Sequence, residues 1–209
     1  MIKIVKWVII GVASLILIVI IAGVYKFNYL ANQDGYDVDG NKIEESHNSE
    51  ILLKWFNLNT SNAFYIKIPE TKIECEITKL IASDSSSYAK GYYVVGDEKG
   101  EVIINNLDIV ALNQAIDNRI YLVIPFSTSN QGSGLFKYLG TFMLDYQDKT
   151  IIHIDSYFLG DRIKINSIKY DGIEKLQIEL NSHSKNQAMS EIPSDLKVVE
   201  LNIVDGNFL

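Results

Sequence analysis

The hydrophobic positions divide the chain into one long apolar run and a remainder in which apolar and polar residues alternate. The run covers residues 4–25, and it carries no charge between Trp7 and Tyr25. A helix of about 20 apolar residues, rising ~1.5 Å per residue, spans a hydrocarbon core of about 30 Å. We therefore predict a transmembrane anchor over residues 1–26. Trp7 and Tyr25 would lie at the two membrane interfaces, where aromatic rings concentrate.

The basic residues around this run predict its orientation. Lys3 and Lys6 precede its charge-free part, whereas Lys26 alone follows it. The positive-inside rule then places the N-terminus in the cytoplasm and the rest of the chain outside. The main alternative is a cleaved signal peptide, but the run is longer than a typical signal core, and cleavage after Ala22 would leave Ile20 at a position that needs a small residue. A buried core helix fits this length least well.

Beyond the run, residues 27–47 are polar and indicate a linker, and the apolar residues after them alternate with period two. Such alternation predicts half-buried strands. Residues 49–56 fit a short helix or an edge strand, and residues 109–118 are the only other helix candidate. Residues 120–126 form the most apolar strand, expected at the centre of a sheet and ending at Pro125. Further strands are expected at residues 64–68, 73–77, 91–95, 101–104 and 196–203, with Asp205-Gly206 closing the last.

Residues 150–182 give the most detailed prediction. Gly160-Asp161 and Asp171-Gly172 are two-residue turn signals between three alternating segments. These turns pair residue 158 with 163, 165 with 178, and Lys164 with Glu179. One face of the resulting antiparallel meander is apolar (Phe158, Ile163, Ile165, Ile178, Leu180), and the other is polar (Asp155, Tyr157, Lys164, Asn166, Gln177, Glu179).

Together these patterns predict an α+β fold that is mostly antiparallel β. The expected organisation is a transmembrane anchor at 1–26, a polar linker at 27–47 and one extracytoplasmic β-rich domain at 48–209.

Charge and cysteine content narrow the functions of that domain. Residues 27–209 hold 16 of the 19 basic residues and all 26 acidic residues, a net charge of −10. This charge disfavours nucleic acid as a partner. Cys75 is the only cysteine, so no intramolecular disulfide can form. Its alternation with Glu74 and Glu76 is typical of a small buried side chain rather than a reactive thiol.

The sequence offers few residues for catalysis or metal binding. None of the three histidines has a second His or Cys at ligand spacing, so neither a metal site nor a cofactor is predicted. Ser133 lies in Q-G-S-G and lacks the pattern of a nucleophile elbow. The weak candidates for a binding site are His153, Asp155 and Tyr157, which also fit the solvated face of a sheet, and Asp161 with Arg162, which could pair in their turn.

Two motifs carry a resemblance. The segment G-S-G-L-F-K-Y-L at 132–139 and the segment S-Y-F-L-G-D-R-I-K-I-N-S-I at 156–168 resemble a family of secreted or membrane-tethered bacterial proteins without an agreed activity. The resemblance implies the fold and the location. Many members of that family resemble one another in carrying a calcium-type loop just before the strand that corresponds to residues 120–126. Here Ala111, Ala115 and Arg119 stand in place of carboxylates, so we expect no calcium there.

These observations predict a single-pass protein of the bacterial cytoplasmic membrane. Its extracytoplasmic domain is expected to be a non-catalytic module that binds another envelope component or a ligand. One alternative is an envelope hydrolase that uses surface carboxylates such as Asp155 and Asp161. Another is an accessory subunit of an envelope machine.

Overall fold

The computed structural model describes residues 48–82, 87–112, 118–130 and 132–209. The chain divides into two compact units, residues 1–44 and 45–209, and every described residue belongs to the second. The expected anchor at 1–26 and linker at 27–47 therefore lie outside the described residues. Within the described ranges, no helix has the length and apolar character needed to cross a membrane.

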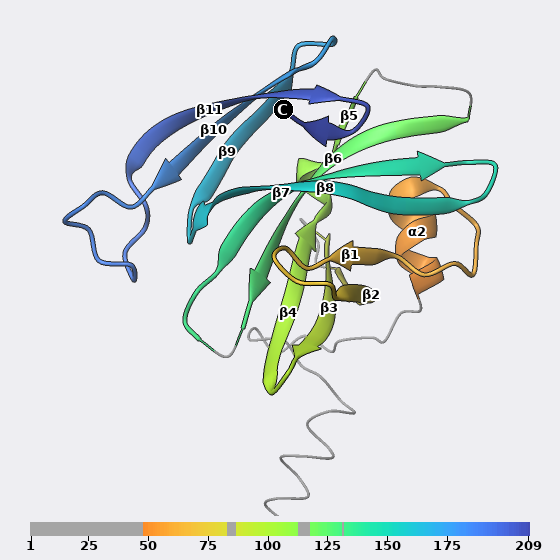
Figure 1. The fold of residues 1–209 in the computed structure, drawn as a ribbon, viewed down its shortest axis with the longest axis horizontal. Helices are drawn as coiled ribbons and strands as arrows, with labels where there is room; N and C mark the ends of the chain where they lie inside the picture. The colour runs from red at the N-terminus through yellow and green to blue at the C-terminus, as the bar shows by residue number, and fades with distance from the viewer. Residues whose placement is uncertain (1–47, 83–86, 113–117, 131) are drawn as a thin grey trace, which may run out of the picture. The chain divides into compact units, whose positions relative to one another are not determined.

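The described unit is mostly antiparallel β, as predicted, and its strands form two sheets (Figure 1). The larger sheet contains, in spatial order, β1 (Tyr65–Lys67), β2 (Glu74–Ala82), β3 (Ser87–Val95), β4 (Glu98–Asn105), β6 (Arg119–Ser129), β7 (Phe136–Asp145) and β8 (Thr150–Asp161), with β5 (Val110–Ala111) beside β6. The smaller sheet has the order β12 (Asn207–Phe208), β11 (Asp195–Val204), β10 (Lys175–Ser182) and β9 (Lys164–Tyr170).

The helix candidate at residues 49–56 is confirmed as helix α2 (Asn48–Phe56), and the edge-strand alternative is wrong. Ile51, Leu52 and Phe56 are buried in the core of the larger sheet, while Glu50 and Lys54 pair one turn apart on the surface. The candidate at 109–118 differs. Its described part contains the strand β5, after a 3-10 turn, η2 (Asn106–Asp108), and residues 113–117 lie outside the described ranges.

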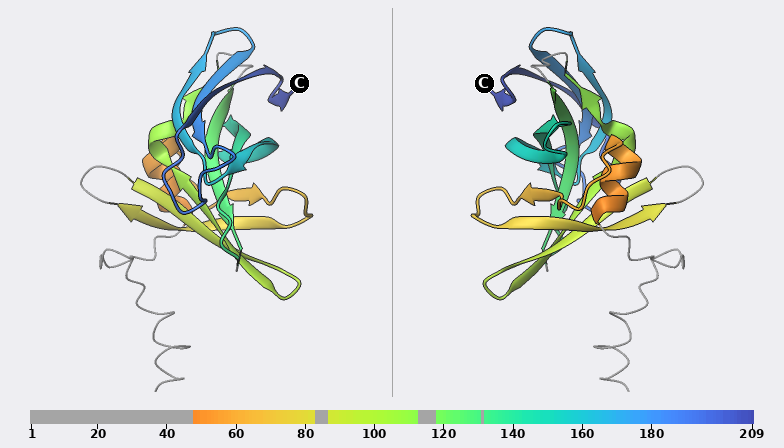
Figure 2. Two further views of the ribbon diagram at one scale, coloured as in Figure 1. Left: turned by 90° about the vertical axis from the view of Figure 1, so that its left-hand side faces the viewer. Right: turned by 90° about the vertical axis from the view of Figure 1, so that its right-hand side faces the viewer.

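The middle of β6, residues 122–126, is apolar because both faces of the strand are buried there. Ile124 and Phe126 lie in the core that the larger sheet shares with α2, whereas Val123 faces the smaller sheet. The prediction of a central strand is confirmed, but its predicted end is wrong, since β6 continues to Ser129. Pro125 is tolerated inside it because β6 changes partners there, with β4 pairing from Phe126 onward and β5 from Val123 backward. Figures 1 and 2 show the smaller sheet along β6 and β7, away from β1 and β2.

The two end strands of the larger sheet, β1 and β8, meet through side chains rather than through a backbone ladder. The backbone N–H of Lys67 on β1 donates to Nδ1 of His153 on β8, at 2.9 Å. Beside β1, the Asn62 amide donates to the carbonyls of Asp148 and Lys149, at 3.3 and 3.1 Å. These contacts close the seam between the two edges.

The predicted three-strand meander is wrong in two respects. Strand β8 remains paired with β7 as far as Asp161, and the chain then turns at Arg162 (φ 49°) into the other sheet, so β8 and β9 form no hairpin. The turn between β9 and β10 is also longer than two residues. Oδ1 of Asp171 accepts backbone N–H groups from residues 173, 174 and 175, so the register shifts.

The shifted register changes the neighbours of the predicted faces. Lys164 lies opposite Asn181 instead of Glu179, and Ile165 lies opposite Leu180. Ile163, Ile178 and Leu180 are buried as predicted. Phe158 is 52% exposed and packs beside the rings of Phe136 and Tyr138 on β7, because its strand belongs to the other sheet.

Cys75 is buried, as predicted, where β2 meets Gly91 of β3. Burial is the main reason that the pKa of its thiol rises to about 12, with a smaller contribution from Glu76. A Cβ atom at position 91 would lie 2.2 Å from the Glu76 carbonyl oxygen and 2.7 Å from the Cys75 sulfur. Only glycine lets the two strands approach this closely.

Candidate basic cleft

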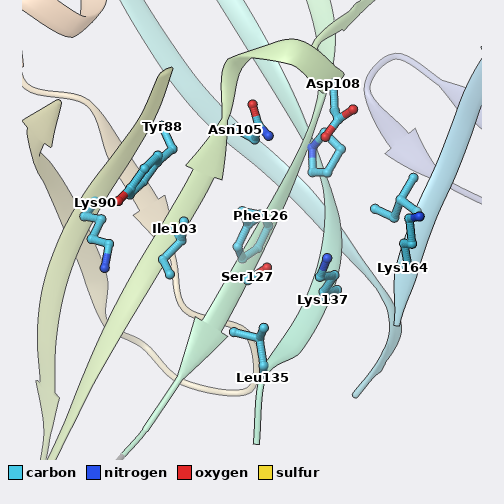
Figure 3. A pocket seen from close by; sticks show the side chains of 12 residues that line it. Tyr88, Lys90, Ile103, Asn105, Asp108, Phe126, Ser127, Leu135, Lys137 and Lys164 are labelled. Atoms are coloured by element: carbon cyan, nitrogen blue, oxygen red, sulfur yellow. The ribbon is translucent and has the colours of Figure 1, made fainter. Parts of the chain in front are cut away.

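The described unit contains an open cleft of about 450 Å³, to which both sheets contribute (Figure 3). Its volume lies within the range of small-molecule sites. Its walls come from five strands and one 3-10 turn. The lining residues are Tyr88 and Lys90 of β3, Ile103 and Asn105 of β4, Asp108 of η2, Pro125, Phe126 and Ser127 of β6, Leu135 and Lys137 at β7, and Lys164 and Ile165 of β9.

Three lysines give the cleft a positive charge within an acidic domain. Lys90 lies on the β3 side, whereas Lys137 and Lys164 lie on the β7 and β9 side (Figure 3). The Lys90 ammonium lies 3.4 Å from a carboxylate oxygen of Glu101 and also over the Tyr88 ring. It is therefore partly neutralised. Among the described residues, no carboxylate oxygen lies within 4.0 Å of the Lys137 or Lys164 ammonium.

The surroundings of Lys137 in the cleft change its pKa. It is half-buried, and desolvation lowers the pKa of its ammonium, an effect that the charge of Asp108 opposes. A half-buried ammonium without a carboxylate partner attracts an anion from solution, because a bound anion would restore the interactions lost with water.

Asp161 and Arg162, predicted from the sequence as a turn pair, brace one wall of this cleft. Arg162 Nε lies 3.9 Å from a carboxylate oxygen of Asp161, so the two side chains do meet. Asp161 accepts the backbone N–H of Leu135 at 2.9 Å, and the backbone N–H of Arg162 donates to the Leu135 carbonyl at 2.8 Å. The Arg162 side chain also donates to the carbonyl of Ser133. These bonds fix Leu135 next to β9.

The other predicted candidates lie at the β1–β8 seam, and His153 corrects the sequence interpretation. It is only 3% exposed, so it does not belong to a solvated face. Its ring stacks on Phe142, with centroids 4.5 Å apart, and meets Phe126 edge-on. Nε2 lies 3.0 Å from both the Asp155 carbonyl and the Ser156 hydroxyl. Because Nδ1 accepts from a backbone N–H, the neutral ring carries its proton on Nε2.

The environment of His153 also sets its titration. Desolvation lowers the pKa of the imidazole to about 4, with a further lowering from Lys67 and opposing contributions from Asp155. The Asp155 carboxylate accepts the backbone N–H groups of Ser156 and Phe208, at 2.8 and 3.1 Å. Tyr157, 38% exposed, packs against the Phe208 ring. These residues hold the C-terminal strand β12 against β8.

The structure thus separates the five candidates into two places and adds a group that the sequence did not indicate. Lys90, Lys137 and Asp108 were missed because they come from distant strands and a 3-10 turn. The one available signal is Lys137 itself, a lysine between the aromatic residues Phe136 and Tyr138 in a strand segment.

Two further observations concern metals. Within the described residues, no group of three or more His, Cys, Asp and Glu side chains is placed to hold a metal ion. Half of the predicted substitution of a calcium-type loop at 111–120, residues 113–117, lies outside the described residues. Its Arg119, however, donates from Nε to the Asp145 carboxylate at 2.7 Å.

Comparison of the chain with protein-family models, curated proteins and solved structures found no match in any of the three. The resemblance carried by the segments at 132–139 and 156–168 therefore stays a prediction. The structure places these two segments around Leu135 and the turn at Arg162, on one wall of the cleft.

Proposed function

We propose that this protein is a membrane-tethered binding module of the bacterial cell envelope, which holds an anionic ligand in the basic cleft. The observation that carries the proposal is Lys137, a half-buried ammonium without a carboxylate partner in an open cavity of about 450 Å³. The charge-free run at residues 7–25 and its basic N-terminal flank support the tether and the orientation.

The geometry favours binding over the hydrolase alternative. The two carboxylates that a hydrolase would use, Asp155 and Asp161, accept backbone N–H groups from Phe208 and Leu135. A general acid or base needs a carboxyl group that can reach a substrate proton. These two groups serve instead to fix neighbouring strands. We therefore assign them structural roles in the module.

Lysine footprinting on spheroplasts tests the proposal with the full chain in its own membrane. A membrane-impermeant N-hydroxysuccinimide ester is added with and without an extract of envelope components, and modified lysines are quantified by mass spectrometry. We expect modification of Lys197, which is exposed on β11 and provides the matched control. We expect the extract to protect Lys137 and Lys164 and to leave Lys197 unchanged.

Each half of the proposal can fail separately in this experiment. If Lys197 is modified only after the spheroplasts are lysed, the extracytoplasmic location is wrong. If Lys197 is modified but the extract protects neither Lys137 nor Lys164, the cleft does not bind an envelope ligand. Trypsin added to intact spheroplasts provides an independent check of location, since it should remove the domain at residues 48–209.

A further inference from the structure

The cleft also has a chemical composition that restricts which anion it can hold, and this inference rests on the function proposed above. Two cations, Lys137 and Lys164, are free of carboxylate partners among the described residues, while Glu101 occupies Lys90. Asp108 contributes a negative charge to the same lining, close enough to influence the pKa of Lys137. The available charge is therefore small, and it suits an anion with one negative charge better than one with two.

The polar groups of the cleft also differ from those of a phosphate site. Phosphate sites commonly use the planar fork of arginine or a cradle of free backbone N–H groups at a helix N-terminus. Among the described residues, no arginine lines this cleft, and most of its residues lie in strands whose backbone takes part in sheet ladders. Such a site offers point charges from lysine and little directional binding for three phosphoryl oxygens.

The rest of the lining is apolar and lies beside the two lysines. Pro125 from β6 faces the cleft together with Leu135 and Ile165. Ile103 and the Tyr88 ring extend this surface toward β3 (Figure 3). An apolar body placed there would gain the free energy of removing both surfaces from water. The head and the body of a ligand thus have separate binding surfaces in one cavity.

We infer that the cleft binds a small amphipathic carboxylate. Its carboxylate contacts Lys137 and Lys164, and its apolar body lies against Pro125, Leu135 and Ile165. Asp108 lies on the same side of the cleft as Lys137 and Lys164, and its carboxylate repels anions that carry a second negative charge.

Three soluble probes test this inference on the full chain in membranes: 4-phenylbutyrate, its uncharged analogue 4-phenylbutanol, and inorganic phosphate. The readout is the concentration that halves the modification of Lys137 and Lys164 by the N-hydroxysuccinimide ester. We expect 4-phenylbutyrate to protect both lysines at a concentration at least about tenfold below that of either other probe. Lys137→Met should raise the concentration that protects Lys164 by roughly tenfold, whereas Lys197→Met should leave it unchanged.

The contrary results distinguish this inference from the function on which it rests. If phosphate protects at a lower concentration than 4-phenylbutyrate, the carboxylate class is wrong and the anion site stands. If 4-phenylbutanol protects as well as 4-phenylbutyrate, the lysines do not hold the head. If no probe protects but the envelope extract does, only this inference fails. If neither the probes nor the extract protect, the proposed function fails as well.

Discussion

The β1–β8 seam and the basic cleft each bury a basic side chain, but they leave it in opposite conditions. At the seam, both ring nitrogens of His153 have hydrogen-bond partners, and its faces pack on Phe142 and Phe126. In the cleft, the Lys137 ammonium has no carboxylate partner among the described residues and faces an open cavity. Burial lowers the pKa of both groups, so a lowered pKa alone does not identify a site. The difference lies in whether the buried group already has its partners.

Removing the seam histidine should produce the largest effect on stability. His153→Ala would leave a cavity between Phe126 and Phe142 and a backbone N–H of Lys67 without its acceptor. We expect the free energy of unfolding to fall by about 3–5 kcal/mol. Urea unfolding followed by circular dichroism measures this change. An exposed control, Lys197→Met, should change it by less than about 0.5 kcal/mol. A loss below about 1 kcal/mol for His153→Ala would show that the seam does not depend on this ring.

Acid should weaken the same seam. The imidazole takes up a proton near pH 6.5 in the unfolded chain but only near pH 4 in the folded protein. Between these values the unfolded state binds more protons, so stability falls as the pH is lowered from about 6.5 to about 4. The total loss from this group is about 3 kcal/mol. Urea unfolding at several pH values measures the slope. His153→Phe should remove this contribution, and an unchanged slope in that variant would assign acid sensitivity to other groups.

A substitution in the wall of the cleft should reduce stability by a smaller amount. Asp161→Ala removes the acceptor of the Leu135 backbone N–H, and we expect a loss of about 1 kcal/mol of stability. Because Leu135 lines the cleft, protection of Lys137 by 4-phenylbutyrate should weaken as well. Asp161→Asn keeps an acceptor oxygen and is the matched control. Equal losses in both variants would mean that the charge of Asp161 matters rather than its hydrogen bond.

The smallest expected change in the free energy of unfolding is an increase rather than a loss. Lys137→Met replaces a half-buried ammonium by an apolar side chain of similar length, so we expect stability to rise by about 0.5–1 kcal/mol. The concentration of 4-phenylbutyrate that protects Lys164 should rise roughly tenfold. Urea unfolding and footprinting of Lys164 measure the two quantities on the same variant. If Lys137→Met destabilises the protein instead, Lys137 supports the fold in the way that His153 does.

Much of the fold could be predicted from alternation, and the exceptions have local physical causes. The strands around Phe64 and Cys75 follow directly from apolar positions at every second residue, and the central strand at 120–126 follows from a continuous apolar run. The turn signals were less reliable. Asp171 uses its side chain to bind three backbone N–H groups, which lengthens the turn, and Gly160-Asp161 remains part of a strand because β7 still pairs with it.

The candidate site could be predicted only in part. Asp161 and Arg162 were identified because turn residues with opposite charges lie next to each other in the sequence. The lysines of the cleft come from β3, β7 and β9, and only the packing of two sheets brings them together. His153 was misplaced because a polar residue in an alternating strand normally faces solvent, and nothing local shows that β1 supplies its partner from 86 residues away.

The tight junction of Cys75 with Gly91 provides an internal probe of strand separation. An alkylating reagent reacts with the thiolate form of cysteine. The buried Cys75 thiol can ionise and meet the reagent only when β2 and β3 separate. The rate of alkylation therefore reports how often that part of the larger sheet opens, without any label being introduced. Comparing the alkylation rate with and without a ligand in the cleft would show whether a ligand bound against β3 makes the β2–β3 pair open less often.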